Sequence, residues 1–214
     1  GKSYRKFLPY GYQKIRKNVL APGTFSLERH RLFWIYLKNE TDFFSATKKK
    51  VLHFAPEQAF YNQFKKIKKL NYTTTDLFSP LADVKADICN LPFKDNEFDY
   101  IFCNHVLEHI PDDNKAMSEL FRVLAPNGIG VFQIPQDLSR EFTFEDYSIK
   151  DPKERATIFG QYDHVRVYGR DYFDKLREIG FNVTAIDYTK KLTKKEIDKY
   201  RLAQGELIPV CRKF

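Results

Sequence analysis

Short apolar runs alternate with amphipathic stretches along most of the chain. Residues 51–55 form an apolar run, and the next stretch carries Phe60, Phe64 and Ile67 on one helical face. Strands and helices that alternate at this spacing are typical of βαβ units, so the pattern predicts an α/β fold with a mainly parallel sheet. The predicted strands are 51–55, 71–76, 87–91, 98–103, 129–134, 181–188 and 207–212, and the predicted helices are 26–38, 58–70, 111–124, 171–179 and 193–203.

The N-terminal part of the chain differs from the rest in charge. Residues 1–50 hold 12 Lys or Arg and 3 Asp or Glu, whereas residues 51–214 hold 24 and 25, so the net charge of +8 comes from the first part. Residues 1–24 contain several Pro and Gly residues, which predicts an irregular arm. One helix follows the arm, and we expect His30 on that helix to be solvated. Such a segment could bind RNA, a phosphorylated substrate or an anionic lipid surface. The basic residues are interrupted, however, and no nucleic-acid motif accompanies them, so we favour a solvated face. We therefore predict a basic N-terminal extension followed by one α/β domain.

Cysteine usage and hydropathy restrict the class of protein further. The three cysteines lie far apart and form no CxxC pair, which argues against a disulfide framework and a cysteine-rich zinc site. A reducing, cytoplasmic location is the simplest interpretation. No apolar run approaches the ~20 residues that cross a bilayer, so we expect no membrane span. The cysteines are Cys89, Cys103 and Cys211.

Asp76 ends the second strand of the alternating region, 21 residues after Ala55. A carboxylate at this place can accept hydrogen bonds from both hydroxyls of a ribose. The alternative is that Asp76 caps the following turn; we favour ribose because strand, helix and spacing agree. The first turn lacks the G-x-G-x-x-G pattern, and the charge of Glu57 would repel a pyrophosphate, which argues against a dinucleotide. S-adenosylmethionine has no phosphate, and its ammonium could pair with Glu57.

Several segments resemble class I S-adenosylmethionine-dependent methyltransferases. The run Phe98-Asp99-Tyr100-Ile101-Phe102-Cys103-Asn104-His105-Val106-Leu107-Glu108-His109-Ile110-Pro111 is similar to the family's fourth strand and following loop, and is the most specific of them. The glycine-poor first turn is the departure from the family pattern. The resemblance implies a Rossmann-like fold: a seven-stranded, mostly parallel sheet with an antiparallel last strand and helices on both faces. It also implies S-adenosylmethionine as the cofactor. The other similar segments are 86–93, 124–130, 164–168, 180–181 and 207–213.

The resemblance assigns roles to particular residues. It implies that Asp87 faces the adenine amino group with Ile88 against the ring, and that Asn104 and His105 line the methionine part. Together with the first turn and the ribose carboxylate, the expected cofactor-binding residues are His53, Phe54, Ala55, Glu57, Asp76, Asp87, Ile88, Asn104 and His105.

Methyl transfer is an in-line displacement that gains mainly from proximity and alignment. An oxygen or nitrogen acceptor also needs a base for its proton, and a neutral imidazole is suited to that task near pH 7. His164 and His105 are the candidates, although His164 could equally be a loop histidine bonded to backbone. Tyr162 and Arg166 could orient the acceptor.

The segment from His105 to His109 also matches H-x-x-E-H, a signature of zinc proteases. That chemistry needs both histidines on one face of a stable helix. Here the motif follows a strand directly, and Pro111 comes two residues after His109. We therefore expect a His-rich loop that packs under the cofactor and not a protease. Because no cysteines stand near the helix that begins at Ser26, we also expect no bound zinc.

The resulting hypothesis is a methyltransferase acting on an oxygen or nitrogen of a small, sugar-like metabolite. The long segment 136–170 would cover the acceptor. One alternative is a catalytically weak or inactive scaffold, because the first turn lacks glycines. Another is a nucleic-acid methyltransferase, although Asn104 opens Asn-His-Val-Leu rather than an Asn-Pro-Pro-Tyr-like box. The sequence names neither the acceptor nor the oligomeric state.

Overall fold

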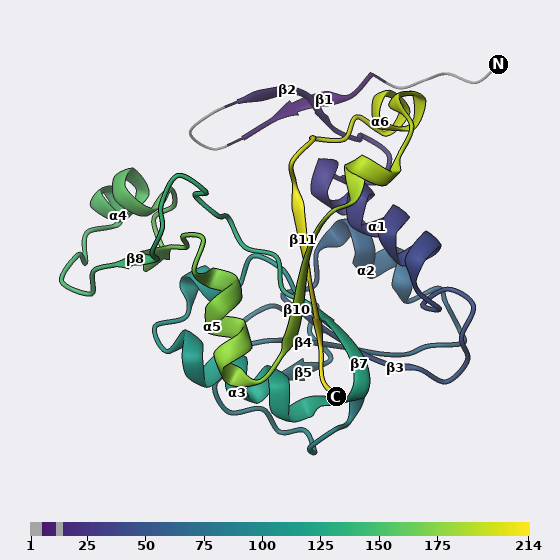
Figure 1. The fold of residues 1–214 in the computed structure, drawn as a ribbon, viewed down its shortest axis with the longest axis horizontal. Helices are drawn as coiled ribbons and strands as arrows, with labels where there is room; N and C mark the ends of the chain where they lie inside the picture. The colour runs from purple at the N-terminus through teal and green to yellow at the C-terminus, as the bar shows by residue number, and fades with distance from the viewer. Residues whose placement is uncertain (1–5, 12–14) are drawn as a thin grey trace. The chain divides into compact units, whose positions relative to one another are not determined.

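The structure of the chain, a computed structural model, describes residues 6–11 and 15–214 (Figure 1). The chain forms two compact units. One, here called the N-terminal unit, combines Gly1–Lys48 with Glu57–Leu70 and Ile186–Ile208. The other, the sheet unit, contains Lys49–Pro56, Asn71–Ala185 and Pro209–Phe214. Two later segments thus pack with the N-terminal residues. The predicted division into an extension up to residue 50 and a domain from residue 51 remains a prediction.

The described residues form a seven-stranded sheet with the order β10-β11-β7-β6-β3-β4-β5. β3 is parallel to β4 and β6, β4 to β5 and β6 to β7, whereas β11 is antiparallel to β7. The Rossmann-like fold with a mostly parallel sheet and an antiparallel last strand is therefore confirmed. The strands are β3 (Lys50–Phe54), β4 (Asn71–Asp76), β5 (Val84–Lys85), β6 (Phe98–Cys103), β7 (Leu124–Val131), β10 (Asn182–Asp187) and β11 (Leu207–Arg212).

The order of the strands reverses at β3, which lies between β4 and β6. Phe54 at the end of β3 is level with Thr75 of β4 and Cys103 of β6. The residues that come next in each strand or loop, Ala55, Asp76 and Asn104, therefore reach the same edge. In open α/β sheets, ligands bind at this carboxyl edge beside the reversal.

The core of the sheet unit explains why these segments fold as they do. The last four residues of β6 are buried, as expected of a central strand that is covered on both faces. The helices α3 (Asp113–Val123) and α5 (Tyr172–Ile179) lie side by side (Figure 1) and contribute Leu120 and Leu176 to the same apolar cluster. α5 ends at Gly180 with φ of 117°, as the sequence predicts.

The segment 136–170 carries structure of its own. β8 (Phe144–Glu145) pairs antiparallel with β9 (Arg166–Val167), and α4 (Pro152–Phe159) lies between them in sequence. The helix begins at Asp151, whose carboxylate accepts hydrogen bonds from the amides of residues 153 and 154. It ends at Gly160 in the left-handed conformation. Sequence analysis missed α4, although Asp-Pro before it and Gly after it are helix start and stop signals.

The N-terminal unit contains a hairpin of β1 (Leu8–Tyr10) and β2 (Arg16–Leu20) where an irregular arm was predicted. Its helices are α1 (Glu28–Glu40), α2 (Gln58–Phe64) and α6 (Lys194–Tyr200), with a 3₁₀ turn, η2 (Tyr188–Lys191). Phe33, Phe60 and Phe64 pack as an aromatic cluster between α1 and α2. His30 is buried against Phe60, so the prediction of a solvated His30 is wrong.

Two other element predictions are also wrong. Residues 87–91 form turns instead of a strand, because Asp87 Oδ1 accepts a hydrogen bond from the Cys89 amide and closes an Asx turn. α2 ends at Phe64 instead of residue 70, and the chain continues in tight turns with amide bonds to carbonyls two or three residues back.

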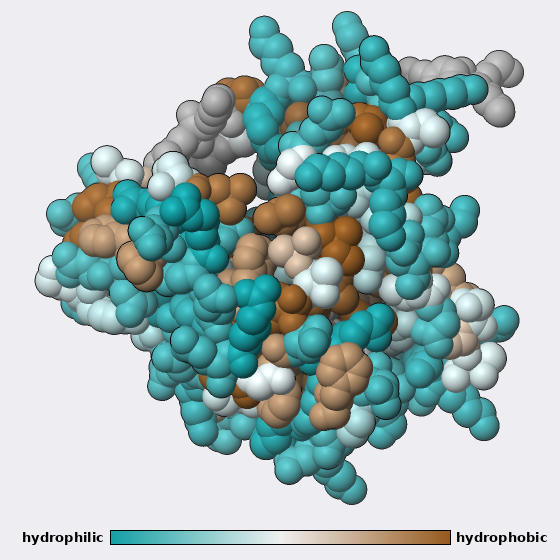
Figure 2. Space-filling view, in the orientation of Figure 1, coloured by the Kyte–Doolittle hydropathy of each residue, from teal (hydrophilic) through white to brown (hydrophobic). Residues whose placement is uncertain are grey.

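No helix in the described part of the chain has the length and apolar character needed to cross a membrane. Most of the face in Figure 2 is hydrophilic, with smaller hydrophobic patches. One of these patches, at the left of the view, lies over the segment that contains β8 and α4.

Candidate functional site

The turn after β3 takes a conformation that favours glycine although it contains none. Ala55 has φ of 43°, in the left-handed region, and its amide donates to Thr75 O at 2.9 Å. Ala55 is half-buried at the carboxyl edge, whereas Phe54 and His53 are buried within β3. His53 Nδ1 lies 2.7 Å from the Tyr72 hydroxyl. His53, Phe54 and Ala55 were all expected in the cofactor site, and of these three residues Ala55 is the one that reaches the edge.

Asp76 ends β4 as predicted and caps the turn that follows. Its Oδ1 accepts hydrogen bonds from the amides of Phe78 and Ser79, both at 2.7 Å. Its Oδ2 makes no hydrogen bond to any described residue. The capping role and the ribose role are therefore compatible, because they use different oxygens of one carboxylate.

Asp87 and Ile88 follow β5, the neighbour of β4 in the sheet. Asp87 Oδ1 accepts from the Cys89 amide at 2.8 Å, which fixes the carboxylate within its turn. Ile88 is buried and belongs to the main apolar cluster. The structure thus places both residues at the same end of the sheet as Asp76.

Asn104 and His105 come directly after β6 and are held by one residue, Gln133. Asn104 Oδ1 accepts from the Gln133 amide at 3.2 Å, and the His105 amide donates to Gln133 O at 2.7 Å. His105 has φ of 55°, so the chain turns sharply at this position. Its Nδ1 lies 3.3 Å from Glu108 Oε1, and its Nε2 is buried without a hydrogen-bond partner among the described residues.

Glu57 belongs to the N-terminal unit, where it precedes α2. Its Oε1 accepts from His30 Nε2 at 2.5 Å and from Arg29 Nη2 at 3.1 Å. His30 Nδ1 accepts from the Leu27 amide at 3.0 Å, so the ring carries its proton on Nε2 and donates to Glu57. The carboxylate expected to pair with the cofactor ammonium therefore already has two donors within its own unit.

His164 is buried before β9, and burial lowers the pKa of its imidazole, which is therefore neutral near pH 7. The ring nitrogen Nδ1 lies 3.0 Å from Phe159 O, so it donates there and leaves Nε2 as an acceptor. This backbone bond was one of the two expectations for His164. The residue also lines an open pocket of about 190 Å³, formed by Pro135, Gln136, Asp137, Phe159, His164, Arg166 and Val167.

The two residues expected to orient an acceptor have contrasting environments. Tyr162 is 53% exposed, and no hydrogen bond fixes its hydroxyl in the described part of the chain. Arg166 is 1% exposed, and its guanidinium donates to the carbonyls of Leu107, Ile110 and Pro111. Arg166 therefore fixes the loop after β6, and its main donors are already used.

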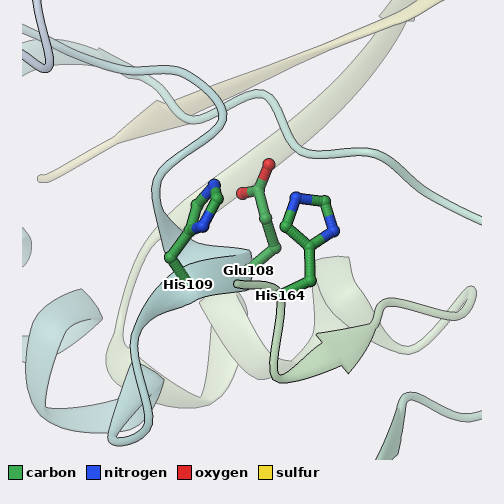
Figure 3. Close-up of side chains that lie close together, drawn as sticks. All are labelled: Glu108, His109 and His164. Atoms are coloured by element: carbon green, nitrogen blue, oxygen red, sulfur yellow. The ribbon is translucent and has the colours of Figure 1, made fainter. Parts of the chain in front are cut away.

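Sequence analysis missed a cluster beside this pocket. Glu108 and His109 of the 3₁₀ turn η1 (Leu107–His109) lie close to His164 (Figure 3). Glu108 and His109 are part of the H-x-x-E-H motif, but that motif suggested that His105 and His109 would pair on one helix. Only the fold brings His164 to the same place.

Comparison with known proteins agrees with this geometry. Residues 46–132 match the family described as "Methyltransferase domain". This match covers less than half of the chain. It agrees with the predicted class I methyltransferase domain and with S-adenosylmethionine as its cofactor, and the order of the strands confirms the Rossmann-like fold.

Curated relatives of the methyltransferase domain match over limited lengths. Sterol 24-C-methyltransferase erg6 of Schizosaccharomyces pombe is 30% identical over 109 residues, which cover 49% of this chain and 27% of that protein. Demethylmenaquinone methyltransferase of Staphylococcus carnosus is 41% identical over 63 residues, covering 29% and 26%. The matched parts thus span about a quarter of each of these relatives.

Solved structures resemble the methyltransferase domain in fold. An S-adenosylmethionine-dependent methyltransferase from Mesorhizobium loti has a TM-score of 0.56 at 16% identity, covering 85% of this chain and 98% of that chain. Phosphoethanolamine N-methyltransferase 2 of Haemonchus contortus, in complex with S-adenosyl-L-methionine, has a TM-score of 0.51 at 18% identity, covering 81% and 41%.

Proposed function

We propose that the chain is an active S-adenosylmethionine-dependent methyltransferase that binds the adenosine part of the cofactor at the carboxyl edge of β3 and β4. The observation that carries this proposal is the position of Asp76. Its carboxylate ends β4 beside the point where the strand order reverses, and Oδ2 has no hydrogen-bond partner among the described residues. An ionised carboxylate accepts hydrogen bonds from both hydroxyls of a cis-diol.

The other contacts follow the order of the strands across the sheet. Asp87 and Ile88, after β5, would hold the adenine, while Asn104 and His105, after β6, would face the methionine part. Ala55 supports the same arrangement, because its left-handed conformation makes the turn that glycine usually makes. Glu57 would meet the cofactor ammonium with a carboxylate that His30 and Arg29 already bind.

The acceptor would bind beneath the segment 136–170. This part of the sheet unit exposes large apolar side chains, which in soluble proteins often mark ligand or partner sites. His105 is the first candidate for the proton acceptor, because its Nε2 is buried without a partner in the described structure. His164 is the second, because it lines the pocket of about 190 Å³. The exposed side chains are Leu138, Phe142, Phe144, Tyr147, Ile158 and Tyr162.

An oxygen or nitrogen atom of a small metabolite remains our first choice of acceptor. A carbon acceptor is a second candidate, favoured by two observations. The curated relatives include a sterol 24-C-methyltransferase and a ubiquinone/menaquinone biosynthesis C-methyltransferase. The apolar side chains of the segment 136–170 would also suit a lipid-like acceptor better than a sugar-like one. A cytoplasmic location stays a prediction from the cysteine usage.

Calorimetry with S-adenosylmethionine and S-adenosylhomocysteine tests the cofactor site. Asp76→Asn is the most informative variant, because an amide oxygen can still accept from the amides of Phe78 and Ser79 while the charge is lost. A hydrogen bond to a charged group contributes ~1.5–3 kcal/mol, so we expect affinity to fall roughly 10- to 100-fold.

Asp146→Asn is the matched control. Asp146 also accepts hydrogen bonds within its own turn, from the amide and hydroxyl of Ser148. Loss of the charge of such a turn carboxylate alone should leave cofactor affinity unchanged. Unchanged affinity in Asp76→Asn would remove Asp76 from the site, and with it the main support for the proposal.

Transfer of a labelled methyl group from S-adenosylmethionine distinguishes the remaining alternatives. Products from small phenols or amines support the first choice of acceptor, and products methylated at carbon support the second. Cofactor binding without transfer to any acceptor class would favour the scaffold alternative. Salt-sensitive binding and methylation of RNA or DNA would favour the nucleic-acid alternative.

A further inference from the structure

Glu108, His109 and His164 form a compact group of metal-ligand side chains in the sheet unit. Their ligand atoms all lie within 4.8 Å of one another. The Glu108 side chain lies next to the two imidazole rings (Figure 3), which meet edge to face with centroids 4.6 Å apart. The three side chains come from the η1 turn and from the residues just before β9, two segments far apart in sequence.

The Glu108 carboxylate is the most unusual member of the group. The residue is 1% exposed, and neither of its oxygens accepts a hydrogen bond from any residue that the structure describes. His105 Nδ1 lies 3.3 Å from its Oε1. Burial of a carboxylate without hydrogen bonds raises the free energy of the folded state, and a bound cation would offset this cost.

Both histidines are oriented by a second partner. His164 Nδ1 donates to Phe159 O, which leaves the Nε2 lone pair available. His109 Nδ1 lies 3.3 Å from Asp163 Oδ2, and Asp163 is in turn bonded to the side chain of Gln161. A carbonyl or a carboxylate behind the ring is the usual arrangement for a histidine that binds a metal through its other nitrogen.

We propose that Glu108, His109 and His164 bind a zinc ion, with the fourth position open to water. Two imidazole nitrogens and one carboxylate oxygen are a recurrent zinc donor set, whereas magnesium and calcium prefer oxygen ligands alone. Zinc bonds of ~2.0–2.1 Å would require the three donor atoms to move closer, to about 3.3 Å from one another.

Two contacts fix the backbone of the group. The Val165 amide donates to Glu108 O at 3.0 Å, which joins the η1 turn to the residue after His164. Arg166 donates to Leu107 O on the other side of the same turn. The donors are therefore arranged by the fold before any metal binds.

The sequence predicted no zinc because the cysteines are missing, and it excluded the zinc protease because that motif needs a helix that pairs His105 with His109. η1 is indeed only a 3₁₀ turn, so that helix is absent. The structure instead brings His164 to the group, which the spacing of the motif could not indicate. The zinc proposal does not depend on methyl transfer. In the zinc-loaded protein the lone pair of His164 is used, which leaves His105 as the candidate proton acceptor.

Cobalt substitution tests the site without an activity measurement. The full chain, without a histidine tag, is treated with a chelator and titrated with Co²⁺, whose visible absorption is intense only in four-coordinate sites. We expect saturation at one cobalt per chain and loss of the band when Zn²⁺ displaces it. Zinc should also raise the Tm of the wild type.

The variants distinguish ligands from neighbours. His109→Gln and His164→Gln should each lose the intense band, whereas His105→Gln, which removes a neighbour of Glu108 and not a ligand, should keep it. Asp163→Asn should keep the band but weaken binding ~10- to 100-fold, as expected for an outer partner. Glu108→Gln is the third ligand variant, and its far-ultraviolet circular dichroism shows whether it folds.

Two results would overturn the proposal. One is a wild-type protein that gives no saturable band although it is folded by circular dichroism. The other is a band that His105→Gln abolishes and His164→Gln retains, which would assign the H-x-x-E-H pair instead. Neither result bears on calorimetry with S-adenosylhomocysteine, so failure here and failure of the proposed function remain distinguishable.

Discussion

Replacing Arg166 with methionine removes the contacts that fix the loop after β6 while keeping a side chain of similar length. Arg166 Nη1 donates to Leu107 O at 3.0 Å and also to Ile110 O, and Nη2 donates to Pro111 O at 2.8 Å. Its Nε donates to Glu145 Oε2 at 2.9 Å. Methionine has a similar apolar stem but no donor, so Arg166→Met leaves the carbonyls without these bonds.

The expected cost follows from the burial of these groups. Ile110 O loses the donor that Arg166 gives it, whereas Leu107 O keeps the Ile110 amide and Pro111 O keeps the Tyr147 hydroxyl. A buried acceptor that loses its partner costs ~1–3 kcal/mol. The pair with Glu145 adds little, because that carboxylate is partly exposed and such pairs contribute ~0–1 kcal/mol. The buried Asp113 carboxylate lies 3.6 Å from Arg166 Nε, so it also loses a cationic partner. We therefore expect the free energy of unfolding to fall by about 3–5 kcal/mol, the range for removing one partner of a buried charged group.

Urea unfolding followed by circular dichroism measures this loss, with Arg177→Met as the control. Arg177 pairs with Asp174, but its side chain is 49% exposed, so its removal should cost less than ~1 kcal/mol. Arg166→Lys keeps the charge without the planar fork and should fall between the two. If Arg166→Met cost no more than Arg177→Met, the three carbonyl bonds would not stabilise the loop, and our interpretation of Arg166 would be refuted.

Two further predictions concern the turn after β3 and the acid side of the stability curve. Ala55→Gly should stabilise the fold by about 0.5–1 kcal/mol in urea unfolding, because relief of ~1–2 kcal/mol of left-handed strain exceeds the ~0.4–1 kcal/mol of added chain entropy. The control Ala59→Gly in α2 should destabilise the fold. Equal effects of the two variants would contradict the assignment of strain to Ala55. The hydrogen bond from Arg122, assisted by the Leu91 amide, holds the pKa of Glu119 below its usual range. The unfolded chain therefore binds more protons than the folded one, so this contribution is present above about pH 4.3 and is lost as the pH falls. Glu119→Gln should flatten the fall in unfolding free energy between about pH 6 and pH 3, and an unchanged slope would rule out this pair as a source of acid sensitivity.

The sequence predicts best the elements whose pattern is determined by burial in the sheet. The strands at 71–76, 98–103 and 207–212 have the predicted bounds, because each is a short run of β-branched, aromatic or apolar residues between turn signals. The failures lie where local hydrogen bonds compete with the pattern. At 87–91 an aspartate side chain closes a turn, and after Phe64 the helix gives way to tight turns.

Some residues of the candidate site could be predicted from the sequence, and others could not. Asp76 ends β4 and Asn104 follows β6, and the bounds of both strands can be read from the sequence. Asp87 follows β5, which the sequence pattern did not predict. The environments of Glu57 and Arg166 could not be predicted, because their partners lie 19 to 59 residues away. Whether a charged side chain is free to meet a ligand depends on such distant partners, which periodicity does not report.

The loop after β6 connects both proposals and allows them to be separated. Gln133 holds its start, at Asn104 and His105, and Arg166 holds the η1 turn that carries Glu108 and His109. If both interpretations hold, Asp76→Asn weakens S-adenosylhomocysteine binding alone, and His164→Gln weakens cobalt binding alone. Arg166→Met should weaken both, because it loosens the common support without removing a ligand from either site. A folded Arg166→Met protein with wild-type affinity for both would mean that neither site needs this loop to be preorganised.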